Sequence, residues 1–350
     1  MRVKKQLASS GGRLLIAAWL LLLLPGVSPA QVYSITDLGT LGGKNSFAFG
    51  INALGQVIGA SDTAGGQSHA FLWTKAGGMQ DLGTLGGSVS KAFGINASGQ
   101  VVGWSAIADK SAHAFLWTKG SGMRDLGTLK GRSSYAVAVN DVGQVAGYSV
   151  DQSSGPTRAF RWTADGGMQD LDTLGGASSK AQAINVFGQI VGWSSTKEEN
   201  KHAFSWTESG GMQDLGVLKN RSESQAVGIN ASGQVVGSCT GSVNSIAFQW
   251  KEGSGLVELE GQGDTFDSKA TAMNAFGQVV GTALGREEQR MNAFVWTKSS
   301  GMRSLGDLIP KDSGWILNVA TAINNLGQIA GYGPVNGVTH AFLLTPISSQ

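Results

Sequence analysis

Cysteine is nearly absent from this 350-residue chain, which contains only Cys239. A single cysteine excludes an intramolecular disulfide and any zinc site built from several cysteines. Charged residues are also scarce, at 14%, whereas hydrophobic residues make up 41% and glycine contributes 53 residues. This composition is too apolar for a disordered chain and too rich in glycine for a helical one.

An excess of basic charge is missing as well. The formal net charge is +2, but Arg2, Lys4, Lys5 and Arg13 lie within the first 30 residues, which hold no Asp or Glu. The remainder has 22 basic and 24 acidic side chains, and so lacks the concentrated positive charge that nucleic-acid binding requires. We therefore expect no nucleic-acid partner.

Long apolar runs do not occur beyond the N-terminus. There, a basic start is followed by 11 apolar residues, 14–24, a run too short for the roughly 20 residues that span a bilayer. Ser28-Pro29-Ala30 then supplies the small residues of a cleavage site. We predict a signal peptide over residues 1–30, cleaved after Ala30, and a secreted or periplasmic domain over residues 31–350 with no membrane attachment. An uncleaved anchor is the alternative.

Internal repetition is the dominant feature of the sequence. The turn N-x-x-G-Q occurs seven times, at spacings of 44, 44, 45, 45, 44 and 50 residues. Its asparagines are Asn52, Asn96, Asn140, Asn185, Asn230, Asn274 and Asn324. Seven copies with no unrepeated segment predict a single repeat domain rather than two unrelated ones.

Each unit has the pattern of four short strands. In the second unit these are residues 92–96, 100–105, 113–118 and 123–127, which are β-branched and aromatic runs between clusters of Gly, Asn and Ser. No segment after residue 30 has a helical period. Such a sheet, repeated seven times, is typical of β-propeller blades. A β-solenoid with two rungs per repeat is the alternative.

The two ends of the chain predict how the ring closes. The domain begins with a strand of the fourth kind, residues 33–39, and ends with a strand of the third kind, residues 340–344. Pairing the two completes a seventh blade and leaves no exposed edge. We therefore predict an all-β, seven-bladed propeller of four-stranded antiparallel blades, closed by its N-terminal strand.

Large apolar side chains recur at two positions of the unit, and we expect both to pack between blades. The third strand carries Trp73, Trp117, Trp162, Trp206, Trp250 and Trp296, with Leu344 in the seventh unit. The fourth strand carries Met79, Met123, Met168, Met212 and Met302, with Leu256 and Ile35 in the other two.

Four H-A-F triplets begin at His69, His113, His202 and His340. Together with D-L-G-T-L and I-N-x-x-G-Q, they resemble the signature of the HAF family of bacterial extracellular repeat proteins. The resemblance covers nearly all of the chain after residue 30. It implies export and, in some relatives, association with the cell surface, and it implies no biochemical activity.

The recurring polar residues favour structural roles. In the units without a histidine, the same position holds Arg158, Ile246 or Asn292, so a shared metal ligand or catalytic base is not expected. The fourth strand carries Asp37, Asp81, Asp125, Asp170 and Asp214, and we expect these carboxylates to bind a turn or a backbone N–H. Cys239 has no histidine close to it in the sequence, so it is expected to be a structural thiol. No phosphate-binding loop, calcium loop or nucleophile elbow with a histidine partner is found. We predict no cofactor, no metal site and no catalytic residue.

The units differ most in the loops between their second and third strands, for example residues 109–112, 151–157, 197–201 and 286–291. Antiparallel strands place these loops and the crossovers between units on one face, called here the loop face. The constant N-x-x-G-Q turns and the Gly-rich turns before the fourth strand lie on the other, the turn face. Because variable loops on a rigid scaffold typically carry binding, the loop face is the candidate site.

Aromatic residues at the loop-face end of the second strand are the candidate ligand contacts. They are Trp104, Tyr148, Trp193 and Tyr332. Rings with a polar tip suit sugar or peptide ligands, and packing between blades is their alternative role. A fifth candidate, Trp315, lies in the crossover 309–319, which is six residues longer than its equivalents. Its alternative role is to pack that loop down.

We therefore hypothesise a monomeric, exported, non-catalytic propeller that binds a saccharide or a protein through its loop face. One alternative is an extracellular hydrolase or lyase acting on a polymer, with Asp264, Asp267 or Glu287 converging at the central opening. The other is a structural scaffold in a cell-surface assembly.

Overall fold

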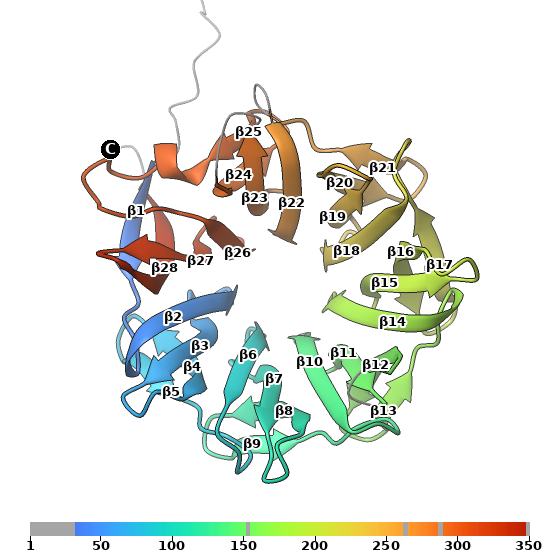
Figure 1. The fold of residues 1–350 in the computed structure, drawn as a ribbon, viewed down its shortest axis with the longest axis horizontal. Helices are drawn as coiled ribbons and strands as arrows, with labels where there is room; N and C mark the ends of the chain where they lie inside the picture. The colour runs from blue at the N-terminus through green and yellow to red at the C-terminus, as the bar shows by residue number, and fades with distance from the viewer. Residues whose placement is uncertain (1–31, 152–154, 262–264, 286–289, 348–350) are drawn as a thin grey trace, which may run out of the picture. The chain divides into compact units, whose positions relative to one another are not determined.

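The computed structural model describes residues 32–151, 155–261, 265–285 and 290–347. Within these ranges the chain forms seven four-stranded antiparallel sheets around a central axis (Figure 1). The described part contains one helical segment, the 3-10 turn η1 (Leu305–Asp307). No helix in it is long and apolar enough to cross a membrane. The predicted seven-bladed propeller is confirmed, and the β-solenoid alternative is wrong.

Each of the first six blades uses four consecutive strands, with the first strand innermost (Figure 1). Blades one to three are β2 (Gly42–Ile51), β3 (Val57–Thr63), β4 (Ser68–Thr74), β5 (Gly78–Asp81); β6 (Ser90–Ile95), β7 (Val101–Ala106), β8 (Ala112–Thr118), β9 (Gly122–Asp125); β10 (Ser133–Val139), β11 (Val145–Val150), β12 (Thr157–Thr163) and β13 (Gly167–Asp170). Blades four to six are β14 (Gly175–Ile184), β15 (Ile190–Thr196), β16 (Lys201–Thr207), β17 (Gly211–Gly216); β18 (Glu223–Ile229), β19 (Val235–Thr240), β20 (Ser245–Lys251), β21 (Gly255–Glu258); β22 (Thr265–Met273), β23 (Val279–Gly285), β24 (Asn292–Thr297) and β25 (Gly301–Ser304).

The seventh blade joins the two ends of the chain. Its inner strands are β26 (Val319–Ile323), β27 (Ile329–Val335) and β28 (Val338–Ile347), and its outer strand is β1 (Val32–Asp37). β1 pairs antiparallel with β28, in a register that sets Ile35 opposite Leu344. The predicted closure by the N-terminal strand is therefore confirmed.

The apolar core lies between neighbouring blades. Trp117 is buried in one cluster with Ile58 and Ala70 of the preceding blade. In every blade the recurring third-strand side chain faces its fourth-strand counterpart, as Trp117 faces Met123 and Leu344 faces Ile35. The expected packing role of these positions is confirmed.

A glycine in each second strand allows the phenylalanine of H-A-F to pack over it. Gly103 lies opposite Phe115, which is fully buried. A Cβ at Gly103 would lie 1.9 Å from the carbonyl oxygen of Lys91 in the innermost strand. The chain approaches itself too closely here for any side chain, and the phenylalanine ring fills the space that the glycine leaves.

A ring of asparagines joins the blades on the turn face. Asn52 Oδ1 accepts hydrogen bonds from the N–H groups of Leu54 and Gln56, and its Nδ2 donates to Gln56 Oε1. The same Nδ2 donates to the carbonyl oxygen of Asn96 in the next blade, at 3.1 Å. Six steps around the ring are made in this way, including the step from Asn324 to Asn52. The repeated asparagine is therefore a structural link between blades.

The recurring histidine and aspartate bind each other at the loop-face ends of the outer strands. His69 Nδ1 lies 2.8 Å from Asp81 Oδ2, while Asp81 Oδ1 accepts the N–H of Gly83. The same pair recurs in three more blades, and Arg158 binds Asp170 in the third blade. The expected role of these carboxylates in binding a turn N–H is confirmed, and the histidine is their second partner.

Candidate functional site

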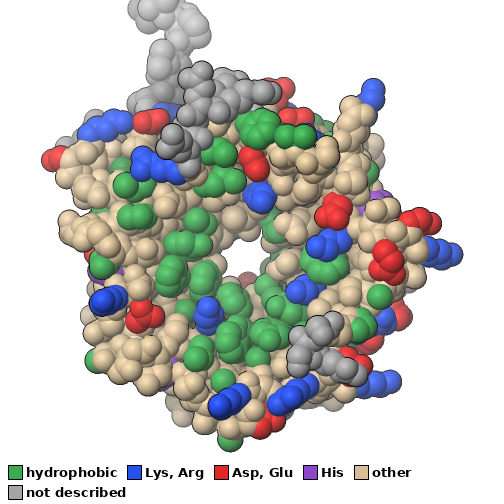
Figure 2. All heavy atoms as spheres, in the orientation of Figure 1, with side chains coloured by type: hydrophobic (Ala, Val, Ile, Leu, Met, Phe, Trp, Pro, Cys, Tyr) green, Lys and Arg blue, Asp and Glu red, His purple; other side chains and the backbone are tan. Residues whose placement is uncertain are grey.

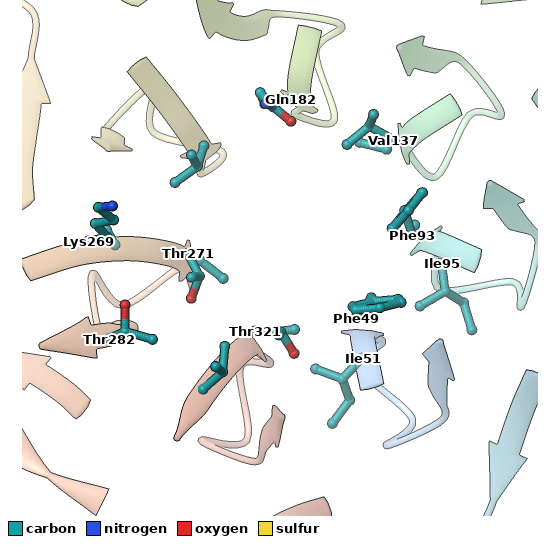
Figure 3. Close-up of a pocket in the computed structure, with 18 of the residues that line it drawn as sticks. Phe49, Ile51, Phe93, Ile95, Val137, Gln182, Lys269, Thr271, Thr282 and Thr321 are labelled. Carbon is teal, nitrogen blue, oxygen red and sulfur yellow. The ribbon is translucent and has the colours of Figure 1, made fainter. Parts of the chain in front are cut away.

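The central opening is lined by side chains from the innermost strands. A pocket of about 570 Å³ lies between them. Phe49, Phe93 and Val137 line one arc of the opening. Next to this arc lie Gln182, beside Val137, and Thr321, beside Phe49, whereas Thr271 lies on the far side from Phe93 (Figure 3). In Figure 2, which looks onto the loop face, hydrophobic side chains gather on one side of this opening, with Lys and Arg side chains around it. The opening is therefore apolar along the first three blades, and polar side chains mix with apolar ones, such as Val227, along the other four.

Beside the opening, a row of aromatic rings crosses the second and third blades. Trp104 and Tyr135 meet edge to face across the boundary between these blades, with ring centroids 5.8 Å apart. Tyr135 then stacks on Tyr148, its partner on the neighbouring strand, at 4.9 Å and an interplanar angle of 18°.

The row continues into the fourth blade through lysines. Lys180 Nζ lies 4.2 Å from the centroid of the Tyr148 ring and 5.9 Å from that of Trp193. Lys201 Nζ lies 4.9 Å from the centroid of Trp193. We call these six residues, from Trp104 to Lys201, the aromatic–lysine row. Each contact is of the kind in which an aromatic face attracts a cation.

Two groups of the row have shifted pKa values, the phenol of Tyr148 and the ammonium of Lys180. Burial raises the pKa of Tyr148 to about 12. Burial also lowers the pKa of the Lys180 ammonium, and the charge of Lys201 lowers it further. The Lys180 ammonium lies against the uncharged rings of Tyr148 and Trp193.

The structure separates the five predicted contact residues into three places. Trp104, Tyr148 and Trp193 belong to the aromatic–lysine row. Tyr332 is in a second cluster, where its ring meets Phe47 of the first blade edge to face at 5.1 Å. Trp315 is apart from both groups, since it packs edge to face on the buried ring of Phe342 at 5.7 Å.

Sequence reasoning missed Tyr135, Lys180 and Phe47. All three stand directly before the constant alanine of the innermost strand, where other units have Lys91, Gln225, Lys269 and Val319. The signal was the variation at this one position inside an otherwise constant strand. The role of this position follows only from the strand register. The register places this residue opposite the aromatic position of the second strand, as Lys180 lies opposite Trp193.

The carboxylates of the enzyme hypothesis do not line the central pocket in the described part of the chain. Asp264 and Glu287 lie outside the described residues. Asp267 is in β22 but is not among the residues that line the pocket. Among the residues that the structure describes, no cluster of three or more His, Cys, Asp or Glu side chains has the arrangement of a metal site.

Comparison with known proteins shows the fold alone. No protein-family model and no curated protein matches the chain. Among solved structures, the chain is similar to the β-propeller domain of the Trilobed protease from Pyrococcus furiosus, with 9% identity, a TM-score of 0.58, and coverage of 86% of this chain and 93% of that one. It is also similar to YCF48 bound to the D1 peptide, with 11% identity, a TM-score of 0.53, and coverage of 91% and 97%.

A third similar structure is a puromycin hydrolase, with 12% identity and a TM-score of 0.56. The similarity covers 85% of this chain but only 52% of the hydrolase, so this chain corresponds to about half of that protein. These neighbours include enzymes and a peptide-binding protein, and at such low identity they define this chain as a β-propeller and no more.

Proposed function

We propose that the protein is an exported, non-catalytic propeller that binds an acidic saccharide on its loop face. The aromatic–lysine row is the observation that carries this proposal. The faces of Trp104 and Trp193 offer stacking surfaces for the apolar C–H faces of sugar rings. Lys180 lies between the rings of Tyr148 and Trp193, and Lys201 lies beside Trp193, so a sugar stacked on this row would bring the carboxylate of a uronic acid close to two ammonium groups.

The adjoining pocket supports the same ligand class. Gln182 supplies an amide that can bind sugar hydroxyls. The hydroxyls of Thr271 and Thr321 donate to the main-chain carbonyls of Ala320 and Ala48, so toward a sugar they act as acceptors. Because the described lining contains no Asp or Glu, the geometry gives no support to a glycosidase, which would need two carboxylates. Export and membership of the HAF family belong to this proposal and are supported by the N-terminal sequence and the repeat motifs.

An acidic segment of a protein is the second candidate ligand. The same lysines and rings would bind its carboxylates and apolar side chains. The similarity in fold to YCF48, whose solved structure has the D1 peptide bound, supports this second candidate.

An array that displays neutral glycans, uronic-acid glycans and acidic peptides tests the proposal. The purified protein is expected to bind the uronic-acid glycans, and the variant Trp104→Ala with Trp193→Ala is expected to lose that binding while remaining folded, with a cooperative thermal unfolding transition above the assay temperature. Val257→Ala, on the exposed edge of the fifth blade, is the control and is expected to bind normally. Binding to acidic peptides alone would favour the second candidate, and binding to neither class would contradict both.

A further inference from the structure

The turn face carries a ring of exposed apolar side chains that the loop-face site does not explain. They occupy the third position of the N-x-x-G-Q turn. They are Leu54, Val142, Phe187, Phe276 and Leu326, and each is between 66% and 75% exposed. We call these five residues the apolar collar. Large apolar groups gathered on one exposed face mark interaction surfaces in soluble proteins.

The fold itself does not require these apolar side chains. In the second and fifth blades the same position holds Ser98 and Ser232. Each serine donates a hydrogen bond to the asparagine of its own turn, at 2.9 Å and 2.8 Å. Because serine fits the turn at least as well, the collar has another reason to be apolar.

The surface inside the collar is also almost uncharged. The second positions of the turns surround the mouth of the channel, a shallow pocket of about 300 Å³. They hold Ala53, Ala97, Asp141, Val186, Ala231, Ala275 and Asn325, of which only Asp141 is charged. The collar and the mouth thus make a mainly apolar annulus, interrupted by Ser98 and Ser232 in the collar and by Asp141 and Asn325 in the mouth.

Charges outside the annulus are separated into two arcs. The turns before the fourth strand carry Lys75, Lys119 and Lys298 in the first, second and sixth blades. The corresponding turns of the third, fourth and fifth blades carry Asp165, Glu208 and Glu252. The acidic arc also contains two cations, since Arg161 binds Glu208 at 2.9 Å and Lys251 precedes Glu252. The seventh blade has no such turn, because β1 supplies its outer strand.

This arrangement is complementary to itself. Consider a two-fold axis that lies in the plane of the turn face, along the diameter between the two arcs. Rotation by 180° about this axis gives a second copy whose turn face meets the first. The basic arc of each copy then lies over the acidic arc of the other. The same operation lays one apolar annulus on the other. An anionic membrane would attract the basic arc and repel the carboxylates of the acidic arc, so it would match only one of the two arcs, whereas a second copy matches both.

In place of the monomer expected from the sequence, we propose that the apolar collar binds a second copy of this chain, turn face to turn face. The resulting dimer leaves both loop faces uncovered and pointing in opposite directions. Two equivalent sites would then bind one polymer, or link two, with an avidity that a single site lacks. The dimer does not depend on the proposed ligand, since it uses the opposite face of each blade.

Sedimentation velocity of the purified protein, from about 1 to 100 μM, tests the dimer. The native protein is expected to associate to dimers, and Phe187→Ser with Phe276→Ser to weaken the association about 100-fold. Serine is the residue that two units already place there, so this variant is expected to keep its unfolding midpoint. Val243→Ser, which removes an equally exposed apolar side chain from the β19–β20 loop, is the matched control and should dimerise normally. A native protein that stays monomeric, or a serine variant that dimerises like the control, would overturn the proposal.

Charge reversal tests the orientation of the two copies. Lys75→Glu with Lys119→Glu makes the rim predominantly acidic, and Asp165→Lys with Glu252→Lys makes it predominantly basic. Each variant alone is expected to be monomeric where the native protein is dimeric, whereas an equimolar mixture should associate. Unchanged dimers of both single variants would overturn the face-to-face arrangement. Binding of a monomeric native protein to vesicles of neutral phosphatidylcholine would identify a membrane as the occupant and would likewise overturn it.

Discussion

Asn324 and Asn52 are 272 positions apart in the sequence, yet Asn324 Nδ2 donates a 3.0 Å hydrogen bond to the main-chain carbonyl of Asn52. This bond joins the last blade to the first on the turn face. The β1–β28 pairing joins the chain ends in the outer half of the seventh blade. The ring is therefore closed twice, once at its inner edge and once at its outer edge.

Replacement of this asparagine tests the inner closure. Asn324→Ala removes the bonds to Asn52 and Gln328 and the acceptor for two turn N–H groups, all in a buried position. We expect the free energy of unfolding to fall by roughly 2–4 kcal/mol, as measured by urea denaturation. The exposed neighbour Asn325 accepts a hydrogen bond from the N–H of Ala275. Asn325→Ala removes that bond and should lower the free energy of unfolding by about 1 kcal/mol. Equal losses in the two variants would show that the asparagine ring does not stabilise the propeller.

The close approach of strands at Gly103 makes a second prediction. Gly103→Ala would bring its Cβ to 1.9 Å from the Lys91 carbonyl oxygen, so the backbone of β6 or β7 must move. We expect a loss of about 3 kcal/mol in the free energy of unfolding. At Gly306, by contrast, an added Cβ would make its nearest contact at 3.6 Å, so Gly306→Ala should be nearly neutral. A stable Gly103→Ala protein would contradict this account of the constant glycine.

The lowered pKa of Lys180 gives the proposed binding a pH dependence. Only the protonated amine attracts a carboxylate, and burial together with Lys201 brings its pKa below the ordinary 10.5. Affinity for an oligouronate should therefore be constant near neutral pH and should fall as the pH rises through this lowered pKa. In Lys180→Gln, affinity is lower near neutral pH and approaches that of the native protein above this pKa, so this part of the pH dependence disappears. Calorimetric titrations at a series of pH values measure both effects. An identical pH profile in the variant would show that Lys180 does not contact the ligand.

The fold was largely predictable from the sequence because the unit is repeated so faithfully. The spacing of the seven asparagines defined the blades, and the unpaired strand types at residues 33–39 and 340–344 defined the closure. In the second unit, the predicted strand ends agree with β6 to β9 within two residues. Strand periodicity and turn residues are local signals. Because the unit is repeated, each signal occurs in seven copies, and their agreement makes the prediction secure.

The candidate site was only partly predictable, because it depends on contacts between blades. Trp104 and Trp193 were identified as variable aromatics. Tyr135 and Lys180 were not, because they are recognised as site residues only once the strand register places them opposite Tyr148 and Trp193. Trp315 could not be placed from the sequence, because whether an inserted loop packs down is decided by the core beneath it. The apolar collar was overlooked for a different reason: its residues lie inside constant turns that have an evident structural role.

A calorimetric titration of the purified protein with hexagalacturonate at neutral pH tests the central claim most directly. The account predicts saturable binding that Lys180→Gln weakens roughly 10- to 100-fold, the range expected for loss of a charged hydrogen bond. Lys44→Gln, an exposed lysine outside the row, should leave the affinity unchanged. Equal affinities for the two variants, or no binding by the native protein, would contradict an acidic-saccharide site on the loop face.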